Sequence, residues 1–98
     1  MVRRVIVRQL AAADLEQAAS WYDEEHAGLG ARFLNDVDQV FGRIRAKPMQ
    51  FPIVSSNIRR ALLHTFPYAV YCRETNEAVL VVAVLHVRRR PGLWRSRS

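Results

Sequence analysis

The longest apolar run of this chain extends from Ala78 to Leu85. A strand that is apolar on both faces belongs inside a sheet, because a strand at a surface alternates apolar with polar positions. The run therefore predicts an interior strand over residues 78 to about 88. The preceding Glu74-Thr-Asn-Glu77 segment is polar and predicts the hairpin turn that leads into this strand.

Residues 11 to about 27 predict an amphipathic helix, because Leu15, Ala18 and Tyr22 recur at helical spacing. In such a helix, Asp14 and Glu16 are expected in the first turn, where the helix dipole favours acidic side chains.

A second helix is predicted after the Gly28-Leu-Gly30 interruption, and it extends to about Lys47, before Pro48. Its apolar stripe consists of Phe33, Val37, Val40, Phe41 and Ile44. The short glycine-containing connection predicts that the two helices form an antiparallel hairpin.

Three more strands are predicted outside these helices. Residues 2–10 alternate valine with arginine, which is typical of a half-buried strand. Residues 48–57 contain two prolines and a Ser-Ser-Asn segment, so they predict a loop. Strands are then expected at 58–65 and 66–73, with a bend or an edge position at Pro67.

The predicted order is β-α-α-β-β-β, an α+β fold in which a helical hairpin packs on one face of a small, mainly antiparallel sheet. A chain of 98 residues can enclose one core without disulfides or metals, so we predict a single domain over residues 1–98. Residues 91–98 are expected to form a basic tail that is either flexible or turned back over the sheet by Pro91-Gly92.

The net charge of +6 is unevenly distributed. Residues 14–38 contain seven acidic residues and one basic residue, whereas residues 39–98 contain eleven basic and two acidic residues. Such asymmetry indicates an anionic partner on one face of the protein.

No pattern in the sequence predicts a metal ion or a cofactor. The chain has no glycine-rich phosphate loop, and its three histidines are too far apart in sequence to form a ligand motif. The single Cys72 and the lack of a continuous apolar leader at the start of the sequence predict a cytoplasmic protein. The longest apolar run is also far shorter than the roughly 20 residues needed to cross a bilayer.

Basic residues surround the ends of the predicted strands. Arg59 and Arg60 are adjacent on one strand, so their side chains point to opposite faces of the sheet. If the last strand stays extended, His86, Arg88 and Arg90 share one face, and Val87 with Arg89 lies on the other. Trp94, Arg95 and Arg97 follow. Arginines interleaved with tryptophan could bind nucleic acid, anchor a protein interface or form a solvated tail.

The same residue types could cleave RNA through its own 2′-hydroxyl. This chemistry needs a general acid and base, together with cations that stabilise the charged phosphorane. His86 is the candidate acid or base, and Arg59, Arg73 and Arg88 are the candidate stabilisers.

The chain resembles the RelE/ParE superfamily of type II toxin–antitoxin toxins, most closely the ParE-like, plasmid-stabilisation branch. The resemblance covers nearly the whole chain and rests on the order of short segments: residues 12–15, Trp21-Tyr22, residues 28–33, Pro48 with Phe51-Pro52, Arg59-Arg60, residues 66–71 and residues 81–94.

The resemblance implies a growth-inhibiting toxin that a cognate antitoxin neutralises. ParE-like members are described as inhibitors of DNA gyrase, and RelE-like members cleave mRNA on the ribosome. The Arg59-Arg60 pair stands where ribonuclease members have lysines, and Trp94 replaces an expected tyrosine. Both departures favour the gyrase-directed function. The RelE-like ribonuclease and a non-catalytic nucleic-acid-binding module remain alternatives.

The same surface is expected to bind the antitoxin, whose acidic and apolar tail would lie across the basic rim of the sheet and the helical hairpin. Leu29, Trp21 and Trp94 are candidate apolar contacts. The residues predicted to contact the target or the antitoxin are Arg59, Arg60, Arg73, His86, Arg88, Arg89, Arg90, Trp94 and Arg95.

Overall fold

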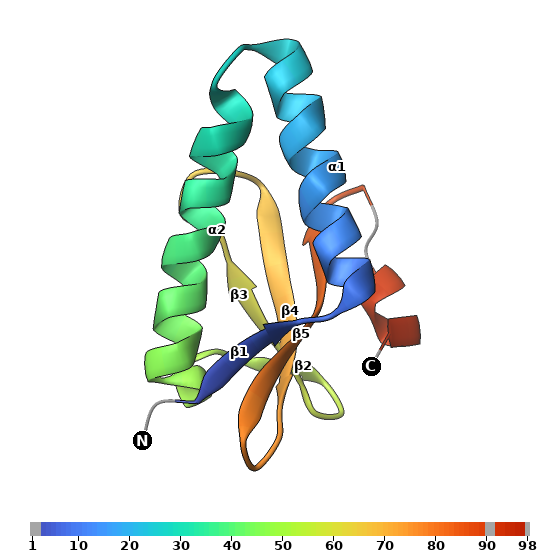
Figure 1. The fold of residues 1–98 in the computed structure, drawn as a ribbon. Coiled ribbons are helices and arrows are strands. Elements are labelled where there is room, and N and C mark those ends of the chain that lie inside the picture. The colour runs from blue at the N-terminus through green and yellow to red at the C-terminus, as the bar shows by residue number, and fades with distance from the viewer. Residues whose placement is uncertain (1–2, 90–91, 98) are drawn as a thin grey trace.

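The structure, a computed structural model, describes residues 3–89 and 92–97, and its elements are labelled in Figure 1. In chain order they are β1 (Arg4–Val7), α1 (Gln9–Glu25), α2 (Leu29–Ala46), the 3-10 helix η1 (Pro48–Gln50), β2 (Ile53–Ser55), β3 (Ile58–Leu62), β4 (Tyr68–Glu74), β5 (Ala78–His86) and the 3-10 helix η2 (Leu93–Arg97). The strands form one sheet in the order β1-β5-β4-β3-β2. β1 is parallel to β5, and the other neighbours are antiparallel.

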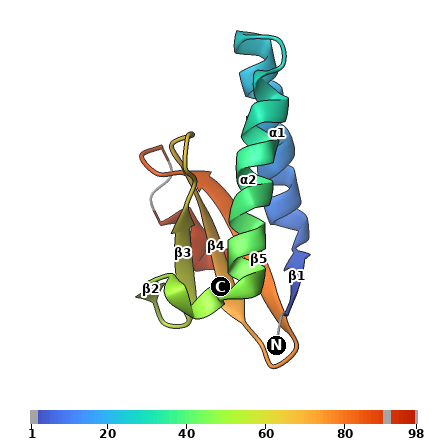
Figure 2. The same ribbon diagram turned by 90° about the vertical axis from the view of Figure 1, so that its left-hand side faces the viewer.

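The α+β fold is confirmed: α1 and α2 form a hairpin on one side of the sheet (Figure 2). The interior position of β5 is also confirmed, because it lies between β1 and β4. The two helices bury their apolar stripes against one face of β5 and its neighbours, and η2 covers a second cluster on the other face, so both faces of β5 are removed from water.

Several predicted boundaries are wrong. β1 ends at Val7 and α1 begins at Gln9, so Asp14 lies in the second turn of α1 and not in the first. The predicted loop over 48–57 contains η1 and the short edge strand β2. Because Pro52 precedes β2 and the strand has only three residues, it lacks the alternating pattern that predicts a strand.

Residues 63–67 form a turn between β3 and β4 and do not extend either strand. The buried carboxylate of Asp36 on α2 accepts hydrogen bonds from the backbone N–H groups of His64, Thr65 and Phe66, at 3.2, 2.8 and 3.2 Å. A buried charge is tolerated where several donors satisfy it. Asp36 therefore fixes the turn to the second helix.

The sheet carries a core on each face. On the helical face, Tyr22, Phe33, Phe66 and Tyr68 pack with ring centroids 4.8–6.0 Å apart. Cys72 belongs to this core, and its burial raises the pKa of the thiol to about 11. On the opposite face, η2 covers a second cluster that is centred on Tyr71 and Trp94.

A bulge in β5 decides which face its last residues occupy. Tyr71 pairs with Ala83 and Cys72 with Val81, so Val82 is an extra residue on β5. Val82 and Ala83 both pack in the cluster beneath η2, whereas Val84 returns to the helical core. The bulge thereby reverses the alternation and places His86 on the helical side, against Tyr68.

The two helices are in close contact at Gly30. A Cβ atom built there would lie 2.4 Å from the carbonyl oxygen of Ala19, and the Gly30 N–H donates to Asp23 at 2.8 Å. We expect Gly30→Ala to lower the free energy of unfolding by about 1–3 kcal/mol, because the helices must separate. Gly42→Ala on the same helix is the control: a Cβ there meets nothing within 4 Å, so stability should rise slightly. Equal urea midpoints for the two variants would contradict this view.

Candidate functional site

A hollow of about 250 Å³ lies where the end of β5 meets the first helix. Its polar lining comes from three segments distant in sequence: Asp14 and Gln17 on α1, Tyr68 at the start of β4, and His86 and Arg89 at the end of β5. Trp21 of α1 forms part of its wall, and we call this site the Trp21 hollow. The fold thus brings two of the predicted site residues, His86 and Arg89, into one concave surface.

His86 is held rigidly at the rim of the Trp21 hollow. Its Nδ1 atom accepts hydrogen bonds from the backbone N–H groups of Arg88 and Arg89, at 3.1 and 3.3 Å, and its ring packs edge-on against Tyr68. Burial lowers the pKa of His86 below its ordinary value of 6.5, and the Arg89 and Arg88 charges lower it further. The imidazole is therefore neutral at pH 7.

This shift predicts that stability falls in mild acid. The unfolded chain takes up a proton at His86 near pH 6.5, whereas the folded protein resists protonation, so the free energy of unfolding decreases as pH falls through 6.5 toward the folded pKa. His86→Asn keeps an acceptor near the position of Nδ1 but does not titrate. We expect urea denaturation of this variant between pH 7.5 and 5.5 to give a flatter profile. A slope equal to that of the unmodified protein would contradict the prediction.

Arg89 occupies the other side of the hollow, where its guanidinium lies 5.0 Å from the ring centroid of Trp21. The indole of Trp21 is 41% exposed. The strand ends at His86 and a turn follows, so the extended geometry that would have aligned Arg88 with His86 is absent. Arg89, and not Arg88, therefore shares the hollow with His86. Arg88 is exposed in the turn, and Arg90 lies outside the described residues.

Arg59 and Arg73 lie toward the opposite end of the sheet. Tyr68 pairs with His86, and Arg73 is five residues farther along β4. At about 3.3 Å per residue, Arg73 is roughly 17 Å from His86 along the strand. Arg59 pairs with Cys72, one residue before Arg73, so it belongs to the same distant group.

The Arg59 side chain is already bound within the fold. Its guanidinium donates to Glu74 at 2.6 Å and to the carbonyl oxygen of Phe51 at 2.6 Å, and Arg3 also pairs with Glu74. Burial alone would raise the pKa of Glu74, but hydrogen bonds and charge from the two arginines together lower it. This cluster joins β3, β4 and the residue before β1 at the end of the sheet remote from the Trp21 hollow.

The remaining predicted contacts are divided between surface and interior. Arg60 is exposed on β3, and Arg73 is partly exposed on β4. Trp94, predicted from its arginine neighbours to contact a partner, is only 6% exposed and stacks on Tyr71 with ring centroids 5.1 Å apart. The Arg95 guanidinium lies 5.1 Å from the Trp94 ring centroid. The described part of the tail is therefore a packed element that closes the second core.

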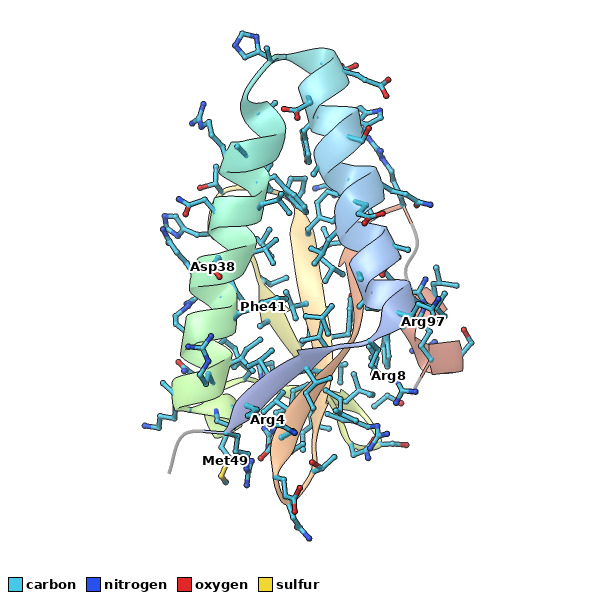
Figure 3. All side chains as sticks on the ribbon, viewed as in Figure 1. Arg4, Arg8, Asp38, Phe41, Met49 and Arg97 are labelled. Atoms are coloured by element: carbon cyan, nitrogen blue, oxygen red, sulfur yellow. The ribbon has the colours of Figure 1, made fainter. Side chains whose placement is uncertain are left out.

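The pair that anchors this tail, Asp14 and Arg97, has no role predicted from the sequence. Arg97 of η2 donates two hydrogen bonds to Asp14 of α1, at 2.5 and 3.2 Å, and one to the carbonyl oxygen of Val82 at 3.4 Å. Asp14 also accepts the backbone N–H of Val84 at 3.0 Å. Figure 3 shows Arg97 beside the first turns of α1. The two residues are 83 positions apart, so no local motif could reveal them.

A second hollow, of about 260 Å³, lies between α2 and the turn after β3 and is lined by residues that include Arg32, Asp36 and His64. The Asp36 carboxylate within it is already satisfied by backbone donors. Within residues 3–89 and 92–97, no group of three or more histidine, cysteine or acidic residues is placed to hold a metal ion. None of the described helices combines the length and apolarity that a membrane span requires.

This fold and surface can be compared with known proteins. A family model described as "ParE toxin of type II toxin-antitoxin system, parDE" matches residues 5–91. The chain belongs to the ParE toxin family. Among solved structures, a chain titled "Chromosomal ParDE TA system from P. aeruginosa" is similar in fold, with a TM-score of 0.78. That similarity covers 87% of this chain and 96% of the other, at 15% sequence identity. No curated protein matches the sequence.

Membership of the ParE family accounts for the arrangement of elements, since the matched residues begin in β1 and extend past the end of β5. η2 lies beyond the match. In the Asp14–Arg97 pair, Asp14 therefore lies within the residues that match the family model, and Arg97 lies beyond them.

Proposed function

We propose that this ParE-family toxin arrests growth by binding DNA gyrase and that a cognate antitoxin neutralises it. The observation that carries the choice of target is the separation of the basic residues. A ribonuclease built from His86, Arg88, Arg59 and Arg73 needs all four around one phosphate. In this fold, His86 and Arg73 are roughly 17 Å apart along the strand, and Arg59 is bound to Glu74 and Phe51.

The proposed mode of action is protein binding, with exposed arginines and Trp21 as anchors. Arginine and tryptophan are enriched where protein interfaces hold most of their binding energy. Arg60, Arg88 and Arg89 are exposed, and they lie at β3 and in the turn after β5. Their charges would speed the encounter with an acidic surface on gyrase or on the antitoxin more than they would fix its affinity.

The direct test uses purified toxin in two assays. With gyrase, ATP and relaxed plasmid, toxin in excess should abolish supercoiling or trap gyrase on cleaved DNA. With translating ribosomes, the mRNA should stay intact. Unimpaired supercoiling at toxin excess would refute the gyrase target, and cleaved mRNA would establish the RelE-like alternative. Salt-sensitive binding to free DNA or RNA without growth arrest would favour the plain nucleic-acid-binding module.

The antitoxin is tested separately in cells. Expression of the toxin alone should arrest growth with filamentation and an SOS response. Coexpression of the cognate antitoxin, sought in a short reading frame beside the toxin gene, should restore growth. Growth that is unaffected by the toxin alone would count against the whole proposal. Growth arrest without filamentation, accompanied by a stop in protein synthesis, would support a toxin that acts on translation and not on gyrase.

A further inference from the structure

The Trp21 hollow presents several hydrogen-bond donors to whatever enters it. Because Nδ1 of the neutral His86 accepts two backbone N–H bonds, the imidazole proton resides on Nε2, and among the described residues Nε2 has no hydrogen-bond acceptor. Gln17 adds an amide group, and Arg89 adds a guanidinium. A site with this excess of donors fits an anionic acceptor.

No residue in the described part of the chain forms an ion pair with Arg89. Among the described residues, the ion pairs involve Arg3, Arg59 and Arg97, and Arg89 instead lies over Trp21. Asp14, the carboxylate that lines the same hollow, is already bound to Arg97 and to Val84. Within residues 3–89 and 92–97, Arg89 is therefore a cation at the hollow without an ion-pair partner, which suits a single negative charge.

The apolar part of the lining indicates that the ligand has an apolar group next to its negative charge. Ala18 and Val84 line the hollow but are only 5% and 1% exposed, so its accessible apolar surface is chiefly Trp21, which is 41% exposed. A volume of about 250 Å³ is below the range of about 300–1,000 Å³ that holds a drug-sized molecule. It is suited to one or two side chains of a polypeptide.

The surrounding charges favour a peptide over a nucleic acid. Helix α1, which forms one wall, carries five acidic residues and no lysine or arginine: Asp14, Glu16, Asp23, Glu24 and Glu25. A chain of phosphates that crossed this wall would be repelled by those carboxylates. An isolated carboxylate beside an apolar side chain avoids this repulsion.

We propose that the Trp21 hollow binds an acidic side chain of the antitoxin, with the adjacent apolar side chain of the same segment packed on Trp21. The carboxylate accepts hydrogen bonds from Arg89 and from Nε2 of His86. This inference rests on the proposed function, because it assigns the antitoxin as occupant. The neutral state of His86 then has a role, because only the neutral ring can accept the Arg88 and Arg89 N–H groups at Nδ1 while it donates from Nε2.

The experiment follows indole N–H resonances in the ¹⁵N-labelled full chain. The protein has two tryptophans, and Trp94 is buried on the far face of the sheet, so its resonance is an internal control. The probe is the blocked peptide acetyl-Leu-Glu-Leu-amide, and acetyl-Leu-Gln-Leu-amide is its uncharged match. The glutamate peptide should shift the Trp21 resonance and leave Trp94 unchanged, and the glutamine peptide should bind at least about tenfold more weakly.

Two variants locate the charge that binds the peptide. Arg89→Gln should weaken binding of the glutamate peptide by at least about tenfold. Arg45→Gln makes the same charge change on the exposed surface of α2 and lines neither hollow, so it should leave binding unchanged. For each variant, amide resonances of residues outside the hollow should coincide with those of the unmodified protein, which establishes that the variant is folded.

The proposal is overturned by an unshifted Trp21 resonance, by equal binding of the two peptides, or by equal binding to Arg89→Gln. It is also overturned if adenosine monophosphate binds more tightly than the glutamate peptide, since the hollow would then be a nucleotide site. Growth arrest by the toxin is measured apart from these titrations. Growth arrest without peptide binding would refute the proposed peptide site and leave the toxin function standing. Peptide binding without growth arrest would refute the proposed toxin function.

Discussion

Replacing Trp94 by alanine is expected to lower the free energy of unfolding by about 3–5 kcal/mol. The indole is 6% exposed and stacks on Tyr71, and it is the largest side chain that closes the cluster on the face of the sheet opposite the helices. Removing it leaves a cavity between η2 and β5 and exposes that face to water. Urea denaturation followed by circular dichroism measures the loss.

The matched control is Trp21→Ala, which removes the same side chain from an exposed position on α1. We expect a loss of about 1 kcal/mol, typical of a change outside the core. If instead Trp94→Ala were as stable as the unmodified protein and lost only partner binding, Trp94 would be the contact residue that its arginine neighbours suggest. The comparison therefore separates a packing role from a binding role.

Asp14→Asn is expected to lower the free energy of unfolding by about 3 kcal/mol. The asparagine oxygen can still accept the Val84 N–H, but the Arg97 guanidinium loses its counter-charge while its side chain remains only 14% exposed. A buried charge without a partner costs more than the pair itself contributes. The effect should persist in 0.5 M NaCl, because salt screens buried pairs weakly.

A double-mutant cycle with Arg97→Met isolates the interaction. The methionine fills part of the space of the arginine and removes its charge, so the double variant should lose less stability than the sum of the two single changes, with a coupling of about 1–3 kcal/mol. Additive losses would mean that Asp14 stabilises the fold through Val84 alone. Glu16→Gln, an exposed acidic position on the same helix, is the control and should have little effect.

The parts of the fold that follow from the sequence are those with a local periodic pattern. The apolar run of β5 predicts its interior position, and the stripe that includes Phe33 and Val37 predicts the second helix and its buried face. The strand β2 was missed because Pro52 and the Ser55-Ser-Asn57 segment are typical of a loop. Its pairing with β3 is a tertiary property, and three residues are too few to display a period.

The candidate site depended on features that no local pattern contains. A single extra residue at Val82 reverses the faces of β5 and places His86 beside α1, and the turn that follows the strand brings Arg89 into the same hollow. Alternation counted from the sequence had grouped His86 with Arg88. Trp94 was misjudged for a related reason, since flanking arginines do not reveal whether an indole faces water or Tyr71.

The interior place of β5 has a consequence for how the domain folds. This strand is the common neighbour of β1, β4, α1 and η2, yet it follows most of them in the chain, and β1 must pair with it across nearly the whole sequence. Closing such a distant contact is entropically costly, so the earlier elements gain little until β5 arrives. A fragment of residues 1–77 is therefore expected to lack a stable core. The domain should therefore fold and unfold as one cooperative unit, and both hollows should be lost together when β5 leaves the sheet.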